Sequence, residues 1–132
     1  MNFTDTLKPG LNAETTAIVT KKNTASSYGS GYLDVFSTPA MIALMEEASY
    51  MTVDAILPSG HTTVGTEVNI KHLAATPIGM KVSARAELLN IDGRALLFKV
   101  EAFDEKAKIG EGTHSRFIVE VEKFMAKTEG KK

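Results

Sequence analysis

The sequence predicts an α+β fold in which one antiparallel sheet wraps around one long central helix. Two observations predict it: a single long apolar helical stretch, and four later segments in which apolar and polar residues alternate. A chain of 132 residues has room for one core, so we expect a single domain over residues 1–132. Wrapping the one-faced sheet around the helix is the simplest way to bury both.

The central helix is expected to begin at Thr38-Pro39. Threonine suits the N-cap, where its hydroxyl accepts a free backbone N–H, and proline suits the first helical position. Apolar residues of the following run, AMIALMEEASYMTVDAIL, cover nearly every face, which indicates a helix buried on most sides. Pro58-Ser59-Gly60 is expected to end it.

Strands are expected on both sides of the helix. The β-branched segment Thr15 to Thr20 predicts a first strand, and a polar, glycine-containing loop follows it. After the helix, the first strand should present on one face Val64, Thr66, Val68, Ile70 and His72. The next two should meet at an Asp92-Gly93 turn and bury Val82, Ala84, Ala86, Leu88, Leu96, Phe98, Val100 and Ala102. In the last strand, Ser115, Phe117, Val119 and Val121 alternate with His114, Arg116, Ile118 and Glu120.

Composition excludes several classes of protein. The chain has no cysteine, which excludes thiolate catalysis and zinc–cysteine sites, and its net charge of −1 does not indicate non-specific nucleic-acid binding. Glu46, Glu47 and Asp54 interrupt the longest apolar stretch, so no membrane span is predicted. We expect a cytoplasmic protein whose residues from about 127 onward fray in solvent.

An apolar helix under a single-layer sheet leaves surface that one chain cannot hide. A second copy is the expected cover, which would give a homodimer with a continuous sheet or a helix contact across a two-fold axis. One helix wrapped by one sheet and paired in this way is the hotdog arrangement.

Three side chains could perform proton-transfer chemistry. Glu46 lies in the most apolar part of the helix, where a carboxylate needs a partner or is poised for proton transfer, although a rim salt bridge to lysine explains it equally well. His72 ends an inward-facing row, where a satisfied core histidine is the commoner case. Thr38 would sit where a helix N-terminus offers free N–H groups to an oxyanion, or would serve only as a cap.

Other groups indicate less. His61 follows Ser59-Gly60 and is expected in an exposed loop, while Arg116 could bind a phosphate or lie at a solvated sheet edge. No two histidines have the spacing of a helical metal site, and the glycine runs do not match a dinucleotide loop. We therefore expect no metal and no cofactor.

Three segments, NTASSYGSGYLDVFSTPAMIALMEEAS, TTVGTEVNIKHLAATPIG and IGEGTHSRFIVEVEKFMAK, together resemble the fluoroacetyl-CoA thioesterase-like family of hotdog proteins. The resemblance runs from about residue 7 to about residue 127. It implies a catalytic threonine, glutamate and histidine at Thr38, Glu46 and His72. It also implies a substrate-binding backbone at Gly65 and an arginine in the site at Arg116.

The resemblance implies an acyl-CoA thioesterase that acts as a dimer on a short or medium acyl-CoA, with coenzyme A as part of the substrate. Tyr32 and Phe36, in YGSGYLDVF, are expected to contact substrate where the family carries a phenylalanine-bearing lid, so selectivity for a fluorinated acyl group is not implied. A non-catalytic acyl-CoA-binding module is the main alternative. A hydratase and a structural dimer without ligand are further ones.

Overall fold

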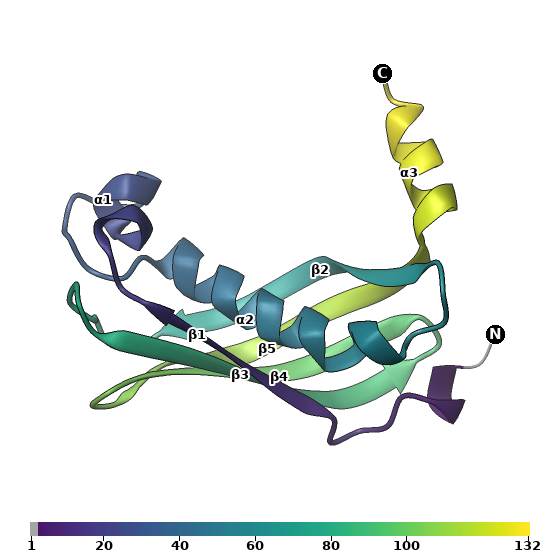
Figure 1. Ribbon diagram of the computed structural model, residues 1–132, viewed down its shortest axis with the longest axis horizontal. Coiled ribbons are helices and arrows are strands. Elements are labelled where there is room, and N and C mark those ends of the chain that lie inside the picture. Colours follow the sequence, from purple (N-terminus) through teal and green to yellow (C-terminus); the bar gives the residue numbers. More distant parts are fainter. Residues whose placement is uncertain (1–2) are drawn as a thin grey trace.

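The computed structural model describes residues 3–132. Five strands form one antiparallel sheet in the order β1-β3-β4-β5-β2. The strands are β1 (Asn12–Ile18), β2 (His61–His72), β3 (Lys81–Asp92), β4 (Ala95–Asp104) and β5 (Lys108–Glu120). The helices are η1 (Phe3–Asp5), η2 (Lys21–Asn23), α1 (Ala25–Tyr28), α2 (Thr38–Val53), η3 (Asp54–Ile56) and α3 (Val121–Glu129). Figure 1 shows α2 lying along the sheet.

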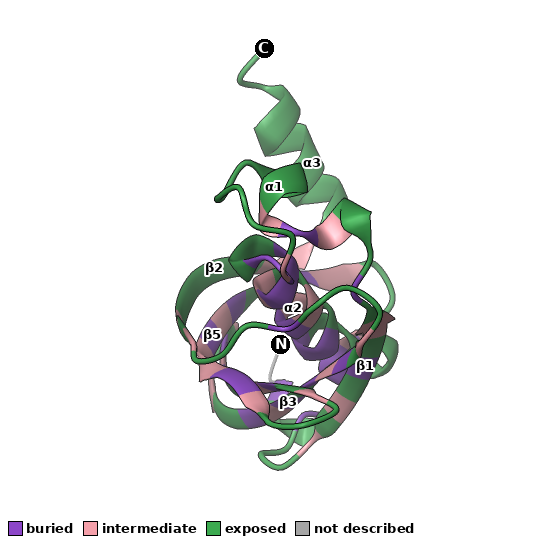
Figure 2. Cartoon of the chain, turned by 90° about the vertical axis from the view of Figure 1, so that its left-hand side faces the viewer, coloured by how far each residue is buried: buried purple, intermediate pink, exposed green. Residues whose placement is uncertain are grey.

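The sheet curls around α2, as the end-on view in Figure 2 shows, and the core lies between them. The β3 and β4 side chains predicted to face inward are all buried: Val82, Ala84, Ala86, Leu88, Leu96, Phe98, Val100 and Ala102. They pack with helix residues such as Met41 and Met45. The helix lies so close to β5 that a Cβ added to Gly110 would come within 2.5 Å of the Met41 sulfur. The predicted fold class is confirmed.

The first turn of α2 differs from the prediction by one residue. Ser37 is the N-cap, and its hydroxyl accepts the backbone N–H of Ala40 at 3.1 Å. Thr38 is the first helical residue and Pro39 the second. Two adjacent hydroxyl residues precede the proline, and the cap falls to the first, whose backbone N–H donates to the Asn23 carbonyl at 3.0 Å and so fixes where the chain enters the helix. The Thr38 hydroxyl is therefore not used to cap the helix.

A β-bulge corrects the predicted face of β2. The pairing of β2 with β5 slips between Gly65 and Glu67, so Thr66 is the extra residue. Before the bulge, Thr63 is buried and Gly65 faces the helix side, so the assignment of Val64 and Thr66 to the inner face was wrong. After it, Val68, Ile70 and His72 pair with Gly110, Gly112 and His114, on the inner face as predicted.

Strand β5 turns a polar face toward the helix. His114 and Arg116 are buried with Ile118, at 1%, 8% and 0% exposure, whereas Phe117 is 41% exposed. The interpretation of Arg116 as lying at a solvated edge is therefore wrong. Two boundaries also move: Asp92 pairs with Ala95, so Gly93-Arg94 forms the hairpin turn, and the first strand occupies Asn12–Ile18 rather than the predicted Thr15 to Thr20.

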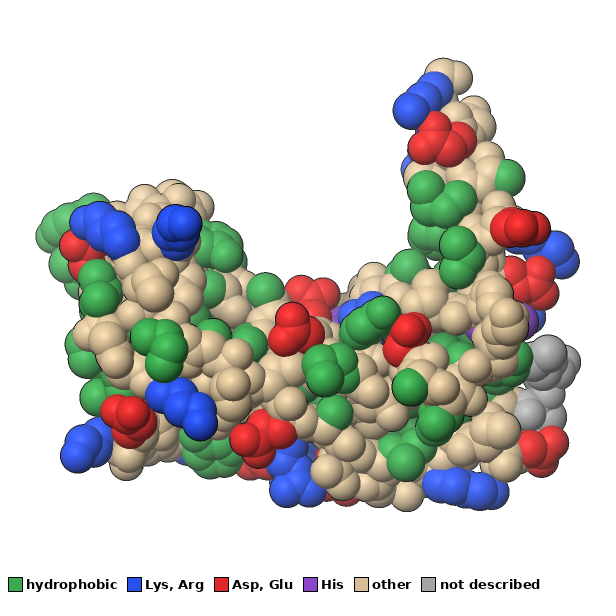
Figure 3. Space-filling view, in the orientation of Figure 1, with side chains coloured by type: hydrophobic (Ala, Val, Ile, Leu, Met, Phe, Trp, Pro, Cys, Tyr) green, Lys and Arg blue, Asp and Glu red, His purple; other side chains and the backbone are tan. Residues whose placement is uncertain are grey.

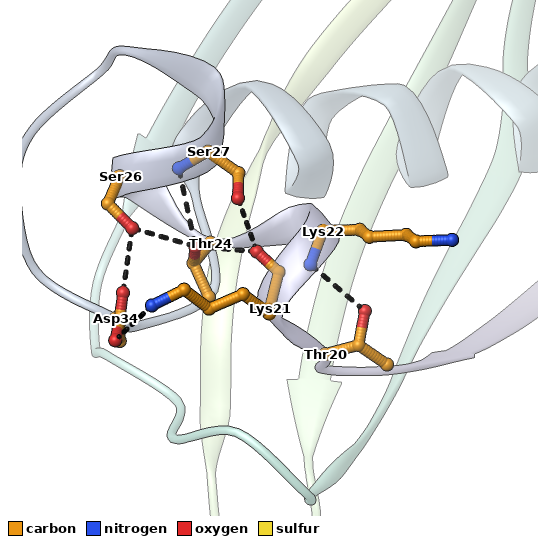
Figure 4. A network of polar contacts seen from close by, with 7 residues as sticks. All are labelled: Thr20, Lys21, Lys22, Thr24, Ser26, Ser27 and Asp34. Carbon is orange, nitrogen blue, oxygen red and sulfur yellow. Dashed lines mark hydrogen bonds and ion pairs between the residues drawn. The ribbon is translucent and has the colours of Figure 1, made fainter.

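The polar loop before α2 has structure of its own. Thr24 is fully buried and caps α1, and its hydroxyl donates to the Lys21 carbonyl at 2.9 Å. Ser26 donates to Asp34, which also pairs with Lys21 at 2.9 Å. Figure 4 shows how these contacts fold the segment back on itself. Short side chains and hydroxyl caps thus replace an apolar core in this segment.

The C-terminal segment leaves the sheet as α3, which projects from the body (Figures 1 and 3). It continues through residue 127 to Glu129, where the sequence suggested a frayed end, and none of its residues is buried. Three of its apolar side chains are exposed by 38–46%: Val121, Phe124 and Met125. Among the described residues, no helix has the length and apolarity needed to span a membrane.

Candidate active site

Thr38 and His72 form a hydrogen-bonded pair at one end of β2. Thr38 is the first residue of α2, His72 is the last of β2, and Thr38 Oγ1 lies 2.7 Å from His72 Nδ1. The hydroxyl can donate to Nδ1 or accept from it, and in both cases Nε2 is left for another group. Nε2 is buried and has no hydrogen-bond partner in the described chain. Burial lowers the pKa of His72, against an opposing backbone contact at Ala74, which favours a neutral imidazole.

A pocket of about 370 Å³ opens beside this pair. Phe36, Thr38 and His72 line it together with the segment that follows β2. Phe36 is only 2% exposed, so it forms a fixed wall. Tyr32 is 89% exposed and is absent from the lining, so within one chain it stands outside the pocket.

Glu46 belongs to a second cluster, further along α2. It is half-buried, whereas its neighbour Glu47 is exposed. A Cβ placed on Gly65 would lie 3.1 Å from Glu46 Oε2, 3.2 Å from His114 Cε1 and 3.4 Å from Arg116 Nη1. A carboxylate, an imidazole edge and a guanidinium therefore converge on the place where Gly65 lacks a side chain, which we call the Gly65 hollow. In the described chain, no hydrogen bond or ion pair holds the Glu46 carboxylate.

Arg116 is held on three sides. Its Nε donates to Thr63 Oγ1 at 2.7 Å, its Nη2 donates to the Thr63 carbonyl at 2.9 Å, and its Nη1 lies 3.2 Å from His114 Nε2. Burial lowers the pKa of Arg116, and the carboxylates of Glu46 and Asp54 oppose that shift. Sequence reasoning did not place Thr63 or His114 in a site. The available signal was that His114 shares a strand face with the apolar Ile118. The other face carries Phe117 and Val119, which are just as apolar, so the pattern did not show which face is buried.

The two clusters do not meet within one chain. Thr38 and Glu46 are eight residues apart on α2, which is about 12 Å along the helix axis. Gly65 and His72 are seven residues apart on β2, which is roughly 20 Å. The structure thus brings Thr38 to His72, and Glu46 to Gly65 and Arg116, but it does not bring Glu46 to His72. Among residues 3–132 there is no group of three or more side chains arranged to hold a metal ion.

The chemistry of the two clusters is complementary. The first has a neutral imidazole with a free ring nitrogen and a hydroxyl, beside a helix N-terminus whose N–H groups favour negative charge. The second has a carboxylate and a fixed cation around a hollow. Together they provide a base or nucleophile, a proton carrier and donors for an oxyanion, which are the parts that acyl transfer requires.

Comparison with known proteins assigns the family. The family model described as fluoroacetyl-CoA-specific thioesterase matches residues 19–122. The fluoroacetyl-CoA thioesterase of Streptantibioticus cattleyicolor is 41% identical over 98 residues, which cover 74% of this chain and 70% of that enzyme. A solved structure of a fluoroacetyl-CoA thioesterase superposes with a TM-score of 0.89 at 33% identity, covering 96% of this chain and 98% of that one.

The fold extends to more distant proteins. A hot-dog-like protein from Thermanaerovibrio acidaminovorans superposes with a TM-score of 0.90 over 99% of this chain and 97% of its own, at 20% identity, which shows the shared fold alone. The predictions of a hotdog fold and of a thioesterase are confirmed. By its family match, its identity to a named thioesterase and its fold, the chain belongs to the fluoroacetyl-CoA-specific thioesterase family.

Proposed function

We propose that the protein hydrolyses an acyl-CoA thioester to the free acid and coenzyme A. The observation that carries the proposal is the Thr38–His72 hydrogen bond, which leaves His72 Nε2 buried and without a partner beside a pocket. A histidine with a free ring nitrogen beside a pocket can accept a proton from a bound substrate or water and return it. The family membership supports the same reaction, because the curated relative is named as a fluoroacetyl-CoA thioesterase.

The active site is completed by a second copy of the chain. Strand β2 lies at an edge of the sheet, and its residues 65–69 are all exposed, Val68 by 47%. An edge strand presents unpaired backbone groups that can add another strand. In two-fold antiparallel pairing of β2 centred on Asn69, with Thr66 again the extra residue, Gly65 lies opposite the partner's His72. Directly opposite residues share a face of the sheet, and the bulge at Thr66 puts both residues on the helix side.

In this homodimer Glu46 of one chain faces Thr38 and His72 of the other. Glu46 attacks the thioester carbon or removes a proton from the attacking water. His72 delivers a proton to the departing sulfur of coenzyme A, and Thr38 holds the imidazole and the carbonyl. The Gly65 backbone N–H and Arg116 stabilise the negative charge that develops on the carbonyl oxygen. Water supplies the hydroxyl group that the acid gains and the hydrogen that the thiol gains.

We expect the protein to be cytoplasmic.

A panel of acyl-CoAs scored for released thiol tests the reaction. Acetyl-, fluoroacetyl-, butyryl-, hexanoyl- and phenylacetyl-CoA cover short and medium groups. We expect turnover of at least one, with Phe36 at the pocket wall setting the size of acyl group that fits. Tight binding of an acyl-CoA without thiol release would instead favour a non-catalytic binding module.

Substitutions of Glu46 and His72, with the adjacent Glu47 as control, test the catalytic residues. Glu46→Gln and His72→Ala are each expected to lower kcat by about 100- to 10,000-fold, the usual range for one proton-transfer group. Glu47→Gln is the matched control, because Glu47 is exposed and one residue away. The measurement is thiol release under saturating substrate. Equal activity of Glu46→Gln and Glu47→Gln would remove Glu46 from the mechanism.

A further inference from the structure

His114 is a buried titratable group that the proposed mechanism does not use. It is 1% exposed, in the middle of β5, and its Nδ1 lies 2.8 Å from the backbone carbonyl of Glu67, next to the bulge in β2. A carbonyl oxygen can only accept a hydrogen bond. Nδ1 must therefore carry the hydrogen, and the neighbouring strand determines the tautomer of this histidine.

The opposite nitrogen faces a cation. With the hydrogen on Nδ1, the neutral ring has a lone pair on Nε2, and Arg116 Nη1 donates to it at 3.2 Å. A protonated ring would place a second N–H against the guanidinium and a second positive charge beside it. Burial and Arg116 lower the pKa of His114, while the Glu67 carbonyl and Glu46 act in the other direction. The net shift is downward, and the donor at Arg116 Nη1 also requires the lone pair that only the neutral ring has, so the neutral form is favoured.

Arg116 is thereby oriented toward the reacting groups. Thr63 takes its Nε and one Nη2 hydrogen, and His114 takes one hydrogen of Nη1. Nη1 also lies beside the Gly65 hollow, to which Glu46 Oε2 is adjacent. Without an acceptor at His114 Nε2, nothing holds Nη1 beside the Gly65 hollow. The guanidinium can then turn toward Asp54 or Tyr50, the other groups that interact with it.

We propose that His114, as the neutral tautomer with its hydrogen on Nδ1, is a positioning residue that fixes Arg116 beside Glu46 at the Gly65 hollow. The inference rests on the proposed function, because the fixed arginine matters only if charge develops in that hollow. It assigns the backbone of Glu67 a role as well, since that carbonyl selects the tautomer.

Two polar substitutions separate positioning from packing. The amide oxygen of His114→Gln can occupy the place of Nε2 and accept from Arg116. The shorter His114→Asn can occupy only the place of Nδ1, near the Glu67 carbonyl, and leaves Arg116 without its acceptor. We expect His114→Gln to keep kcat within about threefold and His114→Asn to lose about 10- to 100-fold, as for other groups that orient a site residue. KM for the acyl-CoA should change less than kcat in both.

A double-variant comparison shows whether His114 acts through Arg116. Adding His114→Asn to Arg116→Met should cost little further activity, because the group that His114 orients is already gone. Equal losses in the Gln and Asn variants, or losses that multiply in the double variant, would overturn the proposal. Thermal unfolding of each variant at one protein concentration identifies any loss that comes from folding.

Histidine and arginine side-chain NMR of the unmodified protein gives a test independent of turnover. We expect the His114 ring nitrogens to report the Nδ1–H tautomer and to take up a proton only below the ordinary histidine pKa of 6.5. The Arg116 guanidinium should show slowed rotation that persists in His114→Gln and disappears in His114→Asn. An Nε2–H tautomer, or a freely rotating Arg116, would reject the positioning role even if the enzyme is active. Absence of thiol release by the unmodified protein would reject the proposed function alone.

Discussion

At the scale of single residues, two adjacent hydroxyls at the start of α2 divide two tasks. Ser37 caps the helix, and Thr38 bonds His72. The serine and threonine side chains differ by one methyl group, so substitution at each position serves as the control for substitution at the other. Substitution of Ser37 should therefore lower the stability of the fold, and substitution of Thr38 should lower the activity.

We expect Thr38→Ala to lower kcat by about a hundredfold, the cost of misplacing a catalytic group, with the unfolding midpoint little changed. Ser37→Ala should lose about 1 kcal/mol of stability through the missing cap and keep its kcat. Thr38→Ser, which retains the hydroxyl, should stay close to the unmodified enzyme. Thiol release and urea unfolding measure the two effects, and a stability loss in Thr38→Ala matching that of Ser37→Ala would contradict this division.

At this scale the sequence located both Thr38 and His72, but it assigned the helix cap to Thr38 instead of Ser37. A Thr-Pro pair indicates a helix start, and either hydroxyl before the proline could serve as the cap. The choice of Ser37 depends on where the chain enters the helix from the α1 segment, which is a tertiary effect. His114 was likewise visible as a residue, but its burial depends on Arg116, Thr63 and the carbonyl of Glu67, which come from two strands.

At the scale of elements, the contact between α2 and β5 depends on a missing side chain. A Cβ on Gly110 would lie 2.5 Å from Met41 Sδ and 2.6 Å from Met41 Cε, and Met41 is fully buried. We expect Gly110→Ala to cost about 1–3 kcal/mol by overpacking. Met41→Leu, which removes the sulfur and the end of that chain, should recover part of the loss in the double variant. Urea unfolding measures the four proteins, and strictly additive losses would show that the two residues do not compete for space.

Elements with regular alternation were predicted well. The inward faces of β3 and β4 are confirmed because every second residue there is apolar, and the shift in their pairing, between Leu88 and Asn90, comes only after the predicted inward residues of β3. Strand β2 was assigned to the wrong face in its first half because a bulge needs no special residue at Thr66. In β5 both faces carry apolar residues, and the polar face is buried because Thr63 and Glu67 satisfy it.

At the scale of the whole molecule, stability should depend on pH through the buried histidines. Burial lowers the pKa values of His72 and His114 below the ordinary 6.5. On acidification the unfolded chain takes up protons at these positions before the folded one does. The free energy of unfolding is therefore expected to be highest above about pH 6.5 and to fall as the pH drops through the folded values. Urea unfolding between pH 8 and pH 5 at one protein concentration measures it, and a flat profile would argue against burial of these rings.

Assembly of the site from two chains has a direct test. Glu46→Gln and His72→Ala homodimers should each be nearly inactive. In a mixed dimer, one site combines the intact Glu46 of one chain with the intact His72 of the other. Random exchange of equal amounts should therefore restore about a quarter of the unmodified activity. Thiol release after partial unfolding and refolding of the mixture measures the recovered activity. If verified mixed dimers recover none, Glu46 and His72 act together within one chain. Composition and periodicity do not predict a site shared between two chains, because it depends on the register of one strand against its copy, although the uncovered apolar surface and the family resemblance both implied a dimer.

The extra residue in β2 acts on the sheet as a frameshift acts on a reading frame. Downstream of Thr66 odd and even positions exchange sides, and only because of that exchange do Gly65 and His72 look toward the same helix. Removing Thr66 would make Gly65 and Glu67 consecutive residues of a regular ladder, and Gly65 and His72 would both stay on the helix side. If Thr66 were instead paired as an ordinary ladder residue, the odd separation of Gly65 and His72 would turn either the Gly65 hollow or the His72 imidazole away from the helix.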